Sequence, residues 1–134
     1  MEFEMVRDAV KKCGLFKGFD EEKLGYLLMH LEIKEFPEGA TIYKKGDEAG
    51  TDFLLLIGGE ACLTADDGRM LEPLGTCQII GELGVISPRQ KRTATVISMK
   101  PVKALKWDYA QIKDRVPELE SRLKDLACKH ASRW

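Results

Sequence analysis

Two charged residues of complementary chemistry lie ten positions apart in the middle of the chain. Glu82 lies between Gly81 and Gly84, and Arg92 opens the run Arg92-Thr93-Ala94. Because glycine has no Cβ, the backbone beside it can come close to a bound group. A carboxylate accepts hydrogen bonds from sugar hydroxyls, and a guanidinium offers a planar fork of donors that suits a phosphate. These types and this spacing give the layout that a nucleotide monophosphate needs.

Each half of this pattern has a simpler explanation when it is taken alone. Gly81 could serve a bend, Glu82 could be a solvated acid at the start of a helix, and Arg92 could be a solvated side chain on an edge strand. The coincidence of both halves favours a binding site. Nothing in the sequence pairs a nucleophile with an adjacent base, or an acid with a base near the presumed phosphate, so we expect a protein that is not an enzyme.

The stretch from Gly81 to Val96 resembles the phosphate-binding cassette of cyclic nucleotide-binding domains. These domains are the sensor modules of the bacterial catabolite activator family, of cyclic-nucleotide-dependent kinases and of gated channels. The resemblance implies that Glu82 binds the ribose hydroxyl, that Arg92 pairs with the cyclic phosphate, and that amides at the start of a short helix face the phosphate. The ligand-binding residues that it implies are Gly81, Glu82, Leu83, Gly84, Arg92, Thr93 and Ala94.

Two details of the stretch affect these assignments. Arg89 follows Pro88, as in kinase members of the family, but the register against Ala94-Thr95-Val96 selects Arg92 as the phosphate ligand. Thr93 could reach the amino group of a guanine, and family members that prefer cyclic GMP often have Thr there, although some that prefer cyclic AMP have it too. We predict cyclic AMP as the ligand, with cyclic GMP as the alternative.

Composition excludes several other classes of protein. The 134 residues suit one domain, and the net charge of −1 gives no global attraction to nucleic acid or acidic membranes. No apolar run approaches the length of a membrane span, and the acidic start lacks the apolar core of a signal peptide, so we expect a cytoplasmic protein.

Metal binding has little support in the sequence. The four cysteines, Cys13, Cys62, Cys77 and Cys128, contain no Cys-x-x-Cys pair, and the two histidines are far apart. A metal-dependent cupin, which is another small β-barrel, needs a clustered set of His and Glu. We therefore expect no metal, no cofactor besides the regulatory nucleotide, and free thiols, buried or half-buried, in a reducing compartment.

Hydrophobic periodicity predicts helices at both ends of the chain. Residues 2–12 have a 3–4-residue apolar spacing, and Asp20 can cap a second helix, so residues 1–30 form a helical N-terminal part. Asp108 can cap a short helix through Val116, and Pro117 suits the first position of the next one. Residues 108–134 therefore form a helical C-terminal part.

The region between them, residues 31–107, alternates short apolar runs with turn residues. The run Phe53-Leu54-Leu55-Leu56-Ile57 is short enough for a strand that is buried on both faces. Gly58-Gly59 and Asp67-Gly68 predict two hairpins. About eight short strands at this spacing indicate an antiparallel β-roll or jelly-roll barrel, of mainly β (α+β) class with flanking helices, in a single domain over residues 1–134. The cyclic nucleotide-binding domain, which the chain resembles from about Leu15 onward, has this architecture.

The last helix carries an apolar stripe with three candidate uses. Its members, at alternating steps of three and four, are Val116, Leu119, Leu123, Leu126 and His130. The stripe could pack on the chain's own core, form a homodimer seam through residues 117–133, or, as the family implies, swing over the ligand as a lid. Trp134 is a candidate cap on the base.

Three function classes remain, of which the weakest is an enzyme with a cupin-like barrel, which metal analysis of the purified protein would test. The first is a ligand-sensing module that passes its signal through the C-terminal helix, either alone or as the regulatory part of a longer protein. The second is a ligand-free domain that keeps the fold and serves as a dimerisation module. The chain shows no basic recognition helix, so we expect no direct binding of nucleic acid by these residues, and no binding to membranes.

Overall fold

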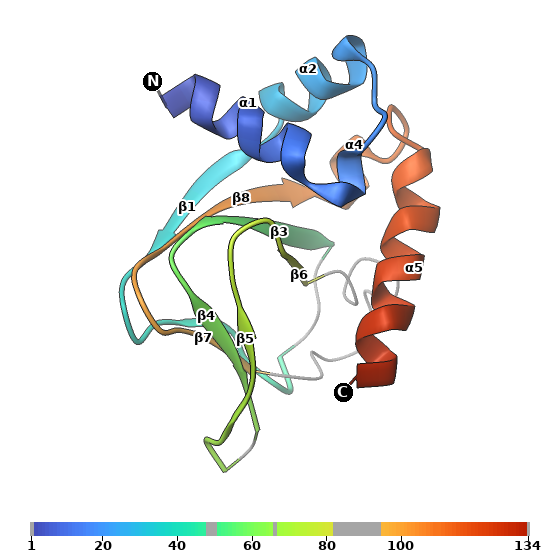
Figure 1. Cartoon of the computed structure of the whole chain (residues 1–134). Helices are drawn as coiled ribbons and strands as arrows, with labels where there is room; N and C mark the ends of the chain where they lie inside the picture. Colours follow the sequence, from blue (N-terminus) through green and yellow to red (C-terminus); the bar gives the residue numbers. More distant parts are fainter. Residues whose placement is uncertain (1, 48–50, 66, 82–94, 134) are drawn as a thin grey trace.

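The computed structural model describes residues 2–47, 51–65, 67–81 and 95–133 of the chain. These residues form eight strands with helices at both ends, which confirms the predicted β-roll of mainly β class (Figure 1). The strands are β1 (Glu32–Phe36), β2 (Thr41–Tyr43), β3 (Asp52–Gly58), β4 (Ala61–Thr64), β5 (Met70–Leu74), β6 (Ile79–Ile80), β7 (Thr95–Ser98) and β8 (Val102–Asp108). The helical elements are α1 (Glu2–Lys12), the 3₁₀ helix η1 (Gly14–Phe16), α2 (Glu21–Met29), α4 (Tyr109–Ile112) and α5 (Glu118–Arg133).

The strands form two four-stranded sheets in place of one closed barrel within the described residues. Sheet A has the order β1-β8-β3-β6, and sheet B has the order β2-β7-β4-β5. All of their neighbouring strands pair antiparallel. The sheets pack face to face and bury one apolar cluster between them, which includes Leu54, Leu63 and Val96. A second cluster lies on the other face of sheet A, under the helices.

The strand β3 contributes to both clusters, as its continuous apolar run predicted. Phe53 and Leu55 belong to the cluster under the helices, while Leu54 and Leu56 belong to the cluster between the sheets. Successive side chains of a strand point to opposite faces, so in a strand between two apolar layers every side chain enters one of these layers and is apolar. The prediction of a strand buried on both faces is confirmed.

The predicted hairpin at Gly58-Gly59 is wrong. The strands before and after this turn belong to different sheets, because β3 pairs with β8 and β6 whereas β4 pairs with β5 and β7. Gly59 has φ +84°, and a Cβ there would lie 2.0 Å from the carbonyl oxygen of Pro101. The glycines therefore serve a tight corner between two sheets. The hairpin at Asp67-Gly68 is confirmed, since β4 and β5 pair directly and Gly68 has φ +87°.

The N-terminal helices cover the outer face of sheet A (Figure 1). The predicted helix over residues 2–12 is confirmed as α1, and Asp20 caps α2 by accepting a 2.8 Å hydrogen bond from the backbone amide of Lys23. Gly14 begins the short helix η1 directly after α1. Among the described residues, no helix combines the length and the apolar character needed to cross a membrane.

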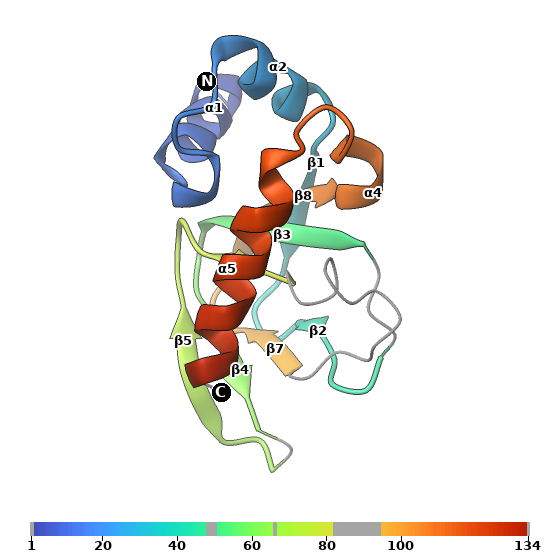
Figure 2. The ribbon, with the colours of Figure 1, turned by 90° about the vertical axis from the view of Figure 1, so that its right-hand side faces the viewer.

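The C-terminal helices differ slightly from the prediction. Asp108 caps α4 through the amide of Ala110 at 3.1 Å, but α4 ends at Ile112, before Val116. Pro117 precedes the first residue of α5, a difference of one position that lies within the usual uncertainty of helix ends. Figure 2 shows α5 lying alongside the β-roll, from the end nearest the N-terminal helices towards β5.

Trp107 is the central side chain of the cluster under the helices. It is fully buried, its indole nitrogen donates a 2.8 Å hydrogen bond to the carbonyl oxygen of Leu27, and its ring lies 5.1 Å from that of Phe16 and 5.6 Å from that of Phe53. The side chain thus joins β8 to α2 and to β3. Its one polar atom, the indole nitrogen, has a hydrogen-bond partner although it is buried.

We expect Trp107→Phe to lower the free energy of unfolding by about 2–4 kcal/mol, because the change leaves a cavity and removes the bond to Leu27. Urea denaturation followed by circular dichroism would measure this loss. Met29→Ala, at a position that is 81% exposed, is the matched control and should change stability by less than about 0.5 kcal/mol. Equal losses in the two variants would contradict this account of the core.

Candidate functional site

The predicted cassette joins the two sheets. Gly81 directly follows β6, which is the edge strand of sheet A, and Thr95 is the first residue of β7, which lies inside sheet B. Of the seven predicted site residues, the structure describes Gly81. The other six, which are Glu82, Leu83, Gly84, Arg92, Thr93 and Ala94, lie outside the described residues. The described residues show the contacts that hold the two ends of the cassette, at Gly81 and at Thr95.

The first end of the cassette is held by a close contact with a tyrosine. Gly81 has φ +89°, a conformation that favours glycine, and a Cβ there would lie 2.6 Å from the hydroxyl oxygen of Tyr43. That hydroxyl donates a 3.0 Å hydrogen bond to the carboxylate of Asp52 on β3. The need for glycine at position 81 thus has a local cause, which is the ring of Tyr43.

The second end is held by hydrogen bonds of Thr95. Its hydroxyl accepts a 2.9 Å hydrogen bond from the backbone amide of Lys45, and its carbonyl oxygen accepts one of 3.3 Å from the hydroxyl of Thr64. Val96, the next residue, is buried in the cluster between the sheets. The stretch after β2 and the strand β4 therefore fix the point where the chain re-enters sheet B.

Sequence reasoning found Gly81 but missed Tyr43 and Asp52. The glycine belongs to a recognisable motif, whereas Tyr43 and Asp52 lie 38 and 29 positions earlier, in strands whose sequence does not mark them as its partners. The contact depends on how β2 and β6 meet in space, which no short-range pattern reports.

The apolar stripe of the C-terminal helix packs on the chain's own core, the first of the three uses considered above. Val116, Leu119 and Leu123 are fully buried in the cluster under the helices, and Leu126 packs against it in part. The side chain of His130 and all of Trp134 lie outside the described residues. The dimer seam and the mobile lid stay predictions.

Two charged residues fasten the start of α5 to the N-terminal helices. The ammonium group of Lys23 on α2 pairs with the carboxylate of Glu118. The guanidinium of Arg122 donates a 2.7 Å hydrogen bond to the carbonyl oxygen of Leu15 and lies 4.5 Å from the ring centre of Phe19. The helix that is expected to carry a signal is thus attached to α2 and η1.

The pKa of Glu118 is lowered, first by the hydrogen bond from Lys23 and then by the bond from its own backbone amide. Because the pKa in the folded state lies below that in the unfolded state, the pair stabilises the fold at pH values above the unfolded-state pKa. This stabilisation is lost as the pH falls through the folded-state pKa.

We expect the difference in unfolding free energy between the parent and Glu118→Gln to be larger at pH 7 than at pH 3, as measured by urea denaturation at both pH values. Glu120→Gln, two residues further along α5 in an exposed ion pair with Lys124, is the control and should show a smaller change between the two pH values. A difference that grows on acidification would contradict the assignment.

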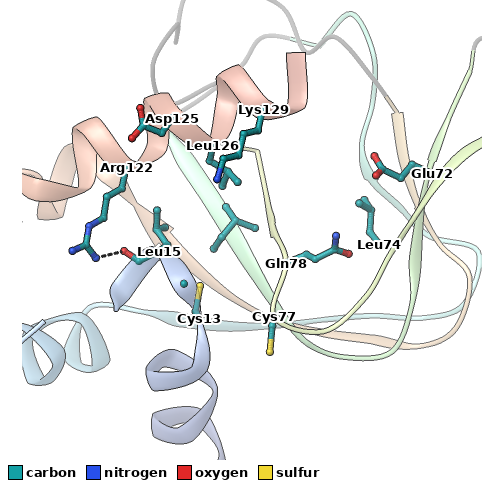
Figure 3. A pocket seen from close by; sticks show the side chains of 12 residues that line it. Cys13, Leu15, Glu72, Leu74, Cys77, Gln78, Arg122, Asp125, Leu126 and Lys129 are labelled. Atoms are coloured by element: carbon teal, nitrogen blue, oxygen red, sulfur yellow. Dashed lines mark hydrogen bonds between the residues drawn. The ribbon is translucent and has the colours of Figure 1, made fainter. Parts of the chain in front are cut away.

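A cavity of about 510 Å³ lies between α5 and the β-roll. Leu15, Leu74 and Leu126 supply apolar walls, and the side chain of Lys129 points down from α5 towards the floor (Figure 3). The turn between β5 and β6, which leads to Gly81, contributes Cys77 and Gln78. The cavity thus lies between the C-terminal helix and the turn that precedes the cassette.

Cys77 occupies a glycine-like backbone conformation in that turn. Its φ is +71°, and no other non-glycine residue in the described part of the chain has a positive φ. An L-residue in the left-handed region costs roughly 1–2 kcal/mol relative to its ordinary conformation.

We expect Cys77→Gly to raise the free energy of unfolding by about 0.5–1 kcal/mol, since the relief of this cost exceeds the greater flexibility of glycine in the unfolded chain. Chemical denaturation of the reduced protein would measure the gain. Cys77→Ala removes the thiol but keeps the Cβ, so it should show no such gain. Equal stabilisation by both variants would assign the effect to the thiol and would contradict backbone strain.

The four cysteines are free thiols, but only two of them match the expectation of buried or half-buried groups. Cys13 and Cys62 are buried, and Cys77 and Cys128 are exposed. Burial raises the pKa of the Cys13 thiol, so this group resists ionisation. Within the described ranges, no cluster of three or more His, Cys, Asp or Glu side chains could hold a metal ion.

Comparison with known proteins identifies the class that this fold and cassette define. The family model of the cyclic nucleotide-binding domain matches residues 33–116, which is more than half of the chain and includes every predicted site residue. The chain belongs to the cyclic nucleotide-binding domain family.

Curated relatives include transcriptional regulators and an ion channel. The CRP-like cAMP-activated global transcriptional regulator of Mycobacterium tuberculosis is 26% identical over 123 residues, which cover 87% of this chain and 54% of the regulator. Potassium channel KAT3 of Arabidopsis thaliana is 31% identical over 85 residues, which cover 61% of this chain and 13% of the channel. The chain thus spans about half the length of the regulator.

Solved structures share the fold along almost the whole chain. A structure described as Sp-2Cl-cAMPS bound to PKAR CBD2 has a TM-score of 0.83 at 21% identity and covers 98% of this chain and 88% of its own. The N-terminal domain of a transcriptional regulator from Streptomyces coelicolor has a TM-score of 0.73 at 26% identity and covers 94% of each chain.

Proposed function

We propose that this chain is a regulatory module that binds cyclic AMP through its cassette, with Arg92 on the cyclic phosphate and Glu82 on the ribose. One observation carries the proposal. Both motif residues fall in the segment that joins β6 to β7, inside the range that the cyclic nucleotide-binding family model matches. The described contacts at Gly81 and Thr95 support the proposal, because they hold both ends of the ligand-binding segment in place relative to the two sheets.

Charge complementarity gives the two residues their roles. A cyclic phosphate carries one negative charge, and a guanidinium with backbone amides near Gly84 and Thr93 would meet it with charge-assisted hydrogen bonds. The carboxylate of Glu82 would accept a hydrogen bond from the ribose hydroxyl. Neither group would act on a covalent bond, so the proposed activity is binding without hydrolysis.

The choice of cyclic AMP over cyclic GMP is supported by relatives. The names of the Mycobacterium tuberculosis regulator and of a Toxoplasma gondii kinase regulatory domain both refer to cAMP. Thr93, which could reach a guanine amino group, keeps cyclic GMP as the competing ligand in any test.

We also propose that the C-terminal helix α5 passes the signal of ligand binding to the rest of the protein or to a partner. α5 is fastened to α2 and η1 near its start and borders the cavity beside the β5–β6 turn, which leads to Gly81. Ligand binding at the cassette would change the packing beneath this helix. A homodimer through residues 117–133 remains a separate proposal, since the described apolar stripe already packs within the chain.

We expect the parent protein to bind cyclic AMP in isothermal titration calorimetry, and Arg92→Ala to weaken binding by about 30- to 1000-fold through the loss of charge-assisted bonds. Glu82→Ala should cost somewhat less. Arg89→Ala, which removes the neighbouring arginine of the same segment, is the matched control and should bind within about twofold of the parent. An Arg92→Ala protein that binds as tightly as the parent would overturn the assignment of the phosphate ligand.

Thermal shift separates the sensor from the ligand-free alternative. At a hundredfold excess over its dissociation constant, a bound nucleotide stabilises the folded state by about 2.7 kcal/mol. A shift with cyclic AMP that exceeds the shift with cyclic GMP supports the proposal as stated. No shift with either nucleotide would favour a dimerisation module, which sedimentation of the same sample would then test.

A further inference from the structure

The contact between Gly81 and Tyr43 is unusually close for this molecule. Of the described glycines, only Gly59 and Gly81 lack room for a Cβ, with neighbours nearer than 3.0 Å. At Gly59 the neighbour is backbone, but at Gly81 it is the tyrosine: a Cβ would lie 2.6 Å from the hydroxyl oxygen, 2.9 Å from the ring carbon that bears it and 3.1 Å from the next ring carbon. A side chain therefore limits where the backbone at Gly81 can go.

A bulge in β2 places the tyrosine against this glycine. Thr41 pairs with Ile97 and Tyr43 pairs with Val96, so two steps along β2 match one step along β7. In a regular strand, successive side chains point to opposite faces, yet both Ile42 and Tyr43 pack against the cluster between the sheets. A bulge re-aims the side chains that follow it, and here it brings Tyr43 inward.

The hydroxyl of Tyr43 is held in turn from β3. It donates a 3.0 Å hydrogen bond to Asp52, which pairs in register with Asp108 at the end of β8. The carboxylate of Asp108 accepts hydrogen bonds from the hydroxyl of Thr51 and from the amide of Ala110, the second residue of α4. Asp52 at the start of β3 thus contacts the hydroxyl of Tyr43, while Thr51, the residue before it, contacts Asp108, which caps α4.

We infer that Tyr43 is a positioning residue for the ligand-binding segment: its hydroxyl, fixed by Asp52, sets the direction in which the chain leaves β6 at Gly81. The inference rests on the proposed function of residues 82–94. Without the hydrogen bond the ring can rotate or withdraw, and the backbone at Gly81 gains room. The segment that follows Gly81 can then take more conformations, and ligand binding must restrict them at a greater entropic cost.

The first test compares two tyrosines in the titration with cyclic AMP. Tyr43→Phe keeps the ring and removes one hydrogen bond, so we expect the dissociation constant to rise by about 3- to 10-fold. Tyr26→Phe is the matched control, because that hydroxyl donates to the carbonyl oxygen of Gln111 on α4, and its loss should leave affinity within about twofold. Both titrations are made well below the melting temperature, so that a loss of stability alone does not change the result.

The second test isolates the bond to Asp52. Asp52→Asn keeps an acceptor oxygen and should retain parental affinity within about twofold, whereas Asp52→Ala should weaken binding. In a double-mutant cycle, Tyr43→Phe should cost at least threefold less in the Asp52→Ala background than in the parent. Independent effects, or affinity unchanged by Tyr43→Phe, would overturn the inference.

A measurement without ligand separates this inference from the proposed function. If the parent binds neither cyclic AMP nor cyclic GMP, the proposed function fails, and hydrogen–deuterium exchange of the ligand-free protein then decides on Tyr43. We expect the peptide that covers residues 81–94 to exchange at least threefold faster in Tyr43→Phe than in the parent, with no change in Tyr26→Phe. Equal exchange in parent and Tyr43→Phe would contradict a positioning role.

Discussion

Burial of β3 on both of its faces is the constraint on which the rest of the molecule depends. One face carries Phe53 and Leu55 against Trp107 and the helices, and the other carries Leu54 and Leu56 against sheet B. β6 and β8, the neighbours of β3 in sheet A, also place side chains in both clusters, so sheet A joins the two apolar layers with β3 between these neighbours. Side chains of this size stabilise the folded state by roughly 1.5–3 kcal/mol each when they are fully buried, so the layers cannot separate without a large loss.

The same strand places the first end of the cassette. β6 pairs with β3, so Gly81 leaves the sheet beside the most buried part of the molecule, and Asp52 at the start of β3 holds the tyrosine that contacts this glycine. Its other neighbour, β8, leads into α4 and then α5. Because β3 pairs with both β6 and β8, one strand lies between the start of the cassette and the strand that leads into the C-terminal helices.

Much of this architecture could be predicted from the sequence, and the failures have physical causes. The burial of β3 on both faces could be predicted, because a run of five apolar residues between turn residues is typical of such a strand. The hairpin at Gly58-Gly59 was predicted wrongly, since a glycine turn looks the same whether its strands pair with each other or with strands far away in sequence. Gly81 was found as part of a motif, but Tyr43 was not, because its position depends on a β-bulge and on the meeting of two sheets. The assignments of Glu82 and Arg92 stay predictions, as these residues lie outside the described part of the chain.

We propose above all that residues 82–94 form the binding segment for a cyclic nucleotide. A crystal structure of the protein grown with cyclic AMP tests this claim most directly. We predict density for the cyclic phosphate against the guanidinium of Arg92, with the ribose hydroxyl within hydrogen-bonding distance of the carboxylate of Glu82. A nucleotide bound elsewhere, or Arg92 and Glu82 on opposite sides of the molecule with packed side chains between them, would contradict it.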